Sequence, residues 1–176
     1  LNRELNFEIN ENTPQNEIDD TISSIKSIEH ITNVYNVPAE LDVKETSGVL
    51  FSDYTLSYVH EGYNLKIISG RAFKENEENV AVVPEVLKDF NSESQRINKI
   101  DGKTLVGKNL VFADESGKEH KLKIVGVYNT SDPIFTGNQI LIPRNSLIKF
   151  NNEVIANAEG STSITSDKAY KILVDD

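Results

Sequence analysis

Two Ser-x-x-Lys motifs stand in the sequence, with the spacing that joins a serine nucleophile to a lysine in penicillin-binding enzymes. They are Ser23 with Lys26 and Ser146 with Lys149. The companion Lys-Thr-Gly motif of those enzymes is absent, because the Lys-Thr pair beginning at Lys103 is followed by leucine. Since so short a pattern occurs twice in one chain of 176 residues, we interpret it as fortuitous and reject catalysis by either serine.

The three histidines, His30, His60 and His120, stand apart from one another, without His-x-His or His-x-x-x-His spacing. A zinc site would need ligands that converge, which this spacing does not predict. We expect each histidine to be exposed or satisfied by hydrogen bonds. The chain also has no cysteine, which excludes disulfides, thiolate metal sites and a cysteine nucleophile.

A Gly-Arg pair, Gly70-Arg71, stands between two apolar runs and just before a glutamate-rich turn. A phosphate-binding loop would need more glycines. Glu75, Glu77 and Glu78 could bind a hard cation, but they lack the spacing of a calcium loop and indicate a solvated turn. We therefore expect a structural corner, in which Gly70 supplies backbone freedom and Arg71 contacts a carboxylate or backbone carbonyls of the turn.

The composition is that of an ordinary globular domain, with 38% hydrophobic and 26% charged residues. Its longest apolar runs are too short to cross a bilayer. The net charge of −10 disfavours nucleic acid and anionic lipid as partners. The chain contains no methionine and opens without a signal peptide, so we expect a processed protein or a piece of a longer one.

The first forty residues predict a β-α-β unit. Residues 5–9 alternate apolar and polar as in a half-buried strand. Thr13 and Pro14 suit the N-cap and the first position of a helix. That helix should carry an isoleucine stripe at Ile18, Ile22 and Ile25, end near residues 29–30, and lead into a strand from residue 31 to 37.

The rest of the chain predicts short strands with little helix. We expect strand-like structure over 48–70, a buried strand over 79–83, a short helix after Pro84, irregular chain over 91–103, a hairpin of 108–113 with 118–128, a strand over 139–142, a short helix to residue 150, a loop over 151–167 and a last strand over 171–174. The predicted class is α+β.

The hairpin is the most detailed of these predictions. Residues 114–117 supply its turn, with Gly117 free to take a positive φ. Alternation along the second arm places Lys121 and Lys123 on the wet face. The side chains expected in the core are Val111, Leu122, Ile124 and Val127.

The middle of the chain resembles the extracytoplasmic domain of ABC transporter permeases of the MacB/FtsX superfamily. The succession LKIISGRAF, NVAVVPEVLKDF, LVGKNLVF, LKIVGVYN and QILIPRNSLIKF carries the resemblance over roughly residues 1–150. The matching positions are Gly70-Arg71, Gly107 within Val-Gly-Lys, Gly126 within Val-Gly-Val, and Pro143 after isoleucine. The order of these pieces is more specific than any one of them.

The resemblance implies a ferredoxin-like porter portion with an inserted, β-rich Sabre-like subdomain. We expect residues 1–64 and 168–176 to form the porter portion, 65–150 the insert and 151–167 a linking loop. The family has a further helix and strand after the insert, which this chain lacks, so the porter portion should be incomplete at its C-terminal end. Residues 5–9 and 171–174 should then lie side by side and parallel, with one edge of 5–9 left open.

The resemblance also implies a non-catalytic domain without a cofactor or metal. It would lie on the extracytoplasmic face of the cell membrane, in a permease that is a dimer and associates with an ATP-binding subunit. Its partners there would be the permease's transmembrane helices and an unidentified extracytoplasmic protein or peptide. One alternative stays open, a free-standing secreted or lipoprotein-derived binding module. The third hypothesis is the rejected one, a cell-wall enzyme using Ser23 or Ser146, and covalent labelling of either serine would reverse that rejection.

Overall fold

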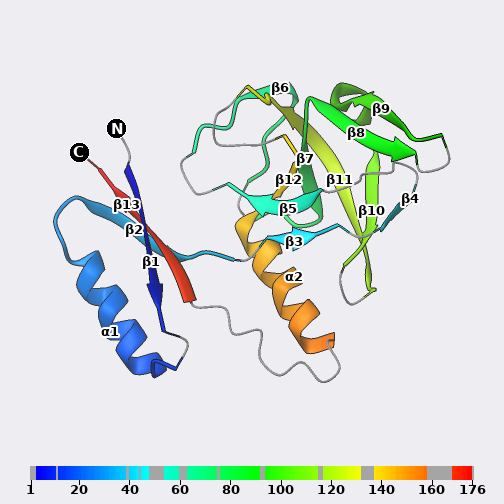
Figure 1. Cartoon of the computed structure of the whole chain (residues 1–176). Helices are drawn as coiled ribbons and strands as arrows, with labels where there is room; N and C mark the ends of the chain where they lie inside the picture. The colour runs from blue at the N-terminus through cyan, green and yellow to red at the C-terminus, as the bar shows by residue number, and fades with distance from the viewer. Residues whose placement is uncertain are drawn as a thin grey trace. The chain divides into compact units, whose positions relative to one another are not determined.

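The computed structural model describes residues 3–10, 12–38, 40–43, 45–47, 54–59, 63–74, 76–91, 94–114, 117–131, 137–157 and 168–175. They form a mixed α+β fold that divides into two compact units (Figure 1). One unit is Leu1–Pro38 with Gly160–Asp176, and the other is Ala39–Glu159. The division therefore differs from the predicted one, because 39–64 belongs with the second unit.

The first unit is a split β-α-β arrangement. It contains β1 (Arg3–Ile9), α1 (Gln15–Lys26), β2 (Ile31–Asn36) and β13 (Lys168–Val174). The sheet order is β1-β13-β2, and β13 is antiparallel to both neighbours. The predicted pairing of residues 5–9 with the last strand is confirmed, but the predicted parallel direction is wrong. A helix joins β1 to β2, so these two strands run parallel, and the strand between them runs the opposite way.

The isoleucine stripe of α1 forms the core of the first unit, as predicted. Ile18 is fully buried with Val34 and Tyr170. Further apolar side chains pack around them: Phe7, Ile9, Ile22, Ile25, Ile31 and Ile172. The helix is shorter than predicted, since Pro14 is its N-cap and it ends at Lys26.

The second unit is built on an eight-stranded sheet. Its strands are β3 (Leu41–Asp42), β4 (Glu45–Ser47), β5 (Thr55–Tyr58), β6 (Ile67–Gly70), β7 (Val80–Pro84), β10 (Asn109–Ala113), β11 (Glu119–Tyr128) and β12 (Gln139–Ile142). The order is β3-β5-β12-β7-β11-β10-β4, and β6 also pairs with β11. Every residue of β7 is buried, because its alternate side chains enter two separate apolar clusters.

The predicted hairpin is present as β10 and β11. The Asp114 amide donates to the Lys118 carbonyl at 2.9 Å, and Gly117 takes a φ of 83°. The side chains of Leu122, Ile124 and Val127 are buried, and both expected lysines of the wet face are exposed. Val111 departs from the prediction: it pairs with Lys121 and is only partly buried.

A second hairpin replaces the short helix predicted after Pro84 and part of the irregular segment after it. It consists of β8 (Val86–Asn91) and β9 (Arg96–Asp101), followed by a 3-10 turn over Gly102–Leu105. Leu87 is fully buried and Val86 is exposed, which is strand alternation. The hairpin is also bonded to Tyr54, whose hydroxyl accepts the Lys88 amide from within β8 at 2.9 Å.

The second helix, α2 (Arg144–Asn157), is longer than predicted and includes residues 151–157 of the expected loop. Residues 158–167 of that loop lie outside the described part of the chain. Among the described residues, neither α1 nor α2 is long and apolar enough to cross a membrane.

Candidate functional site

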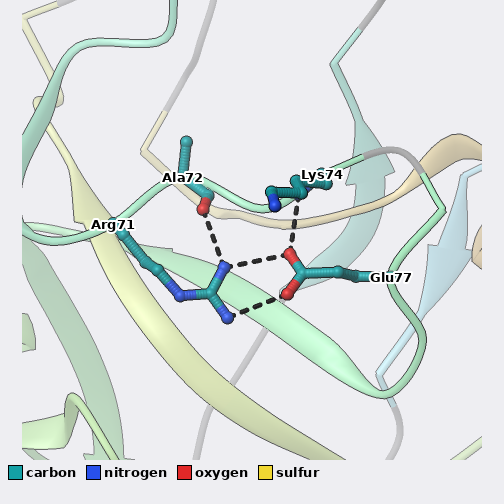
Figure 2. A network of polar contacts seen from close by, with 4 residues as sticks. All are labelled: Arg71, Ala72, Lys74 and Glu77. Carbon is teal, nitrogen blue, oxygen red and sulfur yellow. Dashed lines mark hydrogen bonds and ion pairs between the residues drawn. The ribbon is translucent and has the colours of Figure 1, made fainter.

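Arg71 holds the acidic turn through a two-pronged ion pair with Glu77 (Figure 2). Its Nη1 and Nη2 donate to Oε2 and Oε1 at 3.0 and 2.9 Å, and Nη1 also donates to the Ala72 carbonyl at 3.1 Å. The Lys74 amide donates to the same carboxylate at 2.7 Å. The expected contact between Arg71 and a carboxylate of the turn is therefore confirmed.

The pKa values of Arg71 and Glu77 both shift in the direction that favours the charged form of each side chain. The hydrogen bonds from Arg71 and then from the Lys74 amide lower the pKa of the Glu77 carboxyl. The same pair raises the pKa of the Arg71 guanidinium. Both side chains remain open to solvent, with 55% of Arg71 and 25% of Glu77 exposed, so the contribution of the pair is screened by water and salt.

Arg71 is placed by a close crossing of two backbones. Gly70 lies opposite Gly126 where β6 pairs with β11, and the Arg71 amide donates to the Val125 carbonyl at 2.9 Å. A Cβ at Gly70 would overlap the Val125 carbonyl oxygen, and a Cβ at Gly126 would overlap that of Arg71. Gly70 also has a φ of 71°. Only glycine fits both requirements at this corner.

The other positions of the resemblance lie at turns. Gly107 has a φ of 87° and donates its amide to the Ile124 carbonyl at 2.8 Å. Pro143 is buried, and its carbonyl accepts the Leu147 amide at 3.1 Å as α2 begins. We propose structural roles for all of these positions.

A polar pocket of about 210 Å³ lies between the acidic turn and the first half of α2. The side chains that line it come from both segments: Asn76, Glu77, Glu78, Asn79, Asn145, Ser146, Lys149 and Phe150. Two contacts hold the described residues of the turn: Arg71 pairs with Glu77, and the Asn79 carbonyl accepts the Lys123 amide at 2.8 Å. Sequence reasoning missed this pocket, although it had singled out the glutamates and the Ser146 motif separately.

Ser146 and Lys149 lie one turn apart on α2 and both line this pocket. Ser146 is 7% exposed, while Lys149 is exposed. Within the described part of the chain, neither side chain makes a hydrogen bond or an ion pair, and they do not bond each other. A serine nucleophile needs a base in contact with its hydroxyl. Ser23 is exposed on α1. The geometry therefore favours neither serine as a nucleophile.

His120 is buried against Asp114, with 2.6 Å between Nε2 and Oδ2. Its ring lies beside those of Phe112 and Phe150, at centroid distances of 5.3 and 4.6 Å. Nearby, Lys118 forms an ion pair with Glu153 of α2 at 2.9 Å. These contacts fasten the hairpin turn to the helix, and we interpret them as structural.

The remaining candidate residues form no site among the described residues. His30 is exposed, while His60 and Glu75 lie outside the described part of the chain. No group of three or more potential metal ligands gathers within the ranges that the structure describes.

The fold of the chain is similar over its whole length to that of the extracellular domain of an ABC-type transporter. One solved structure that it matches is the extracellular domain of the noncanonical ABC-type transporter YknZ from Gram-positive bacteria. It matches with a TM-score of 0.51 and 12% identity, over 100% of this chain and 84% of that one. No protein-family model and no curated protein matches the chain. The predicted resemblance is thus confirmed for the fold, while individual residues cannot be transferred at this identity.

Proposed function

We propose that the chain is the non-catalytic extracellular domain of an ABC transporter permease. The observation that carries the proposal is the match over the full length of the chain to a transporter's extracellular domain. The geometry around the serines is consistent with it, because neither hydroxyl contacts a base among the described residues. ATP hydrolysis would then take place in a separate cytoplasmic subunit.

The two units correspond, in this proposal, to the porter portion and its insert. The order β1-β13-β2 is that of the first, third and second strands of a ferredoxin-like sheet. A fourth strand would pair with the outer edge of β1. The β-rich second unit, joined to the first by two connections, is the Sabre-like insert.

The domain would bind an extracytoplasmic partner or substrate and relay movement driven by ATP hydrolysis. It would lie outside the cell membrane, in a dimeric permease, between the first and second transmembrane helices. The charge of −10 suits a cationic peptide or a basic partner surface, since complementary charge speeds encounter and selects partners.

The full-length gene tests this proposal against a free-standing secreted or lipoprotein-derived module. A permease should have hydrophobic helices encoded on both sides of these 176 residues, and a neighbouring gene for an ATP-binding subunit. Protease treatment of intact cells should cleave this segment and spare the subunit. A gene that encodes no flanking transmembrane helix would overturn the permease and favour the free-standing module. Covalent labelling of Ser23 or Ser146 by a β-lactam probe would instead support the hypothesis of a cell-wall enzyme.

A further inference from the structure

One wall of the polar pocket offers hydrogen-bond donors. The first turn of α2 lines it, and the amides of a first helical turn have no acceptor within the helix. Ser146, a residue that is 7% exposed, adds a hydroxyl that makes no hydrogen bond to any described residue. Lys149 adds an ammonium group without an ion pair there. A hydroxyl, an ammonium and a helix N-terminus together form a site for a carboxylate.

The facing wall is acidic. Both carboxylate oxygens of Glu77 already accept hydrogen bonds, from the Arg71 guanidinium and from the Lys74 amide. The carboxylate of Glu78 makes no ion pair within the described residues, although Lys149 lines the same pocket. Two opposite charges thus border one small space without contacting each other.

The charges on the two walls restrict what can bind between them. A simple anion would be repelled by the two glutamates, and a simple cation by Lys149 and the helix N-terminus. A molecule that carries both charges satisfies both walls. The volume of about 210 Å³ lies below the range of roughly 300–1,000 Å³ common for drug-sized ligands, which restricts the ligand to a small one.

We propose that this pocket binds a zwitterion of amino-acid size. Ser146, Lys149 and the first turn of α2 hold its carboxylate, and Glu78 holds its ammonium group. The Ser-x-x-Lys pair is then a binding pair and not a nucleophile with its base. This ligand site is independent of the transporter assignment, because it rests only on side chains within the second unit.

The test is a titration of the isotope-labelled 176-residue chain with L-alanine, followed by amide chemical shifts. We expect saturable shifts at residues 76–79 and 145–147. N-acetyl-L-alanine lacks the ammonium group and L-alaninamide lacks the carboxylate, so each should bind at least about tenfold more weakly. Equal binding of either derivative would overturn the zwitterion, as would the absence of saturable shifts with L-alanine.

Variants connect the binding to the named side chains. Lys149→Gln and Glu78→Gln replace exposed groups, so both variants should fold normally. Each should weaken L-alanine binding by about tenfold, and Ser146→Ala by severalfold. Lys121→Gln, on the wet face of the β10–β11 hairpin, is the matched control and should bind as the original chain does. Unchanged binding in both Lys149→Gln and Glu78→Gln would overturn the assignment.

Discussion

Replacing Gly70 by alanine should destabilise the second unit more than an ordinary glycine substitution does. The positive φ of 71° alone costs an L-residue about 1–2 kcal/mol. The new methyl group also overlaps the Val125 carbonyl oxygen, and such overpacking costs a further 1–3 kcal/mol or so. We therefore expect Gly70→Ala to lower the free energy of unfolding by about 2–5 kcal/mol.

Substitutions at two other glycines measure separately the cost of a positive φ and the cost of an overlapping Cβ. At Gly107 φ is 87°, but no atom lies within 4 Å of an added Cβ, so Gly107→Ala should show the backbone cost alone. At Gly126 φ is not positive and an added Cβ overlaps the Arg71 carbonyl, so Gly126→Ala should show the overlap alone. Because Gly70 and Gly126 face each other, the double variant should cost less than the two single variants together.

The assay is urea unfolding followed through the amide peaks of β7 and β11. Peaks from single strands are needed because the chain has two units, which need not unfold together. If Gly70→Ala costs no more than Gly107→Ala, the two backbones do not cross as closely as described, and the argument for glycine at the corner fails.

Three further predictions follow from features of the fold. Arg71→Ala should lower the melting temperature and Arg71→Lys should restore only part of it, because lysine cannot form the two-pronged pair with Glu77; an unchanged melting temperature with lost partner binding would instead indicate a functional arginine. Burial raises the pKa of Tyr128 above its ordinary value near 10, so the unfolded chain loses this proton first, and stability should fall as pH rises above about 10. Tyr128→Phe should flatten that decline in a pH series of urea midpoints, and an equal decline in both proteins would refute it. The outer edge of β1 should exchange its amides faster in this chain than in a chain extended by the family's last strand, and equal protection of residues 5–9 would contradict the open edge.

Local patterns predicted the elements whose side chains follow one period over many residues. The isoleucine stripe of α1 and the alternation from Glu119 to Ile124 are of this kind. The segment after Pro84 is too short for its apolar spacing to separate helix from strand. The partner that makes it a strand is β9, whose residues are all exposed, Ile97 included, except for the half-buried Ile100. Pairing with such a strand leaves little trace in the sequence.

The pocket could not be predicted because its walls meet only in the folded chain. Residues 76–79 and 145–150 are far apart in the sequence, and each segment alone suggests a different, unrelated chemistry. The direction of β13 was predicted wrongly for another reason. This strand lies between β1 and β2, which a helix connects and which therefore run parallel, and it pairs antiparallel with both. The residue types of a strand do not show in which direction it runs.

The central position of β13 also determines the order in which the chain can fold. β1 and β2 have no sheet contact with each other except through this last strand, and the Thr32 hydroxyl donates to a Leu173 carbonyl 141 residues away. During synthesis the three-stranded sheet of the first unit therefore cannot form until residues 168–174 have emerged. Pairings over such separations are slow to form. The unit that contains β1 is thus completed only after the second unit has been synthesised, and until then β1 and β2 lack a partner strand and are open to aggregation.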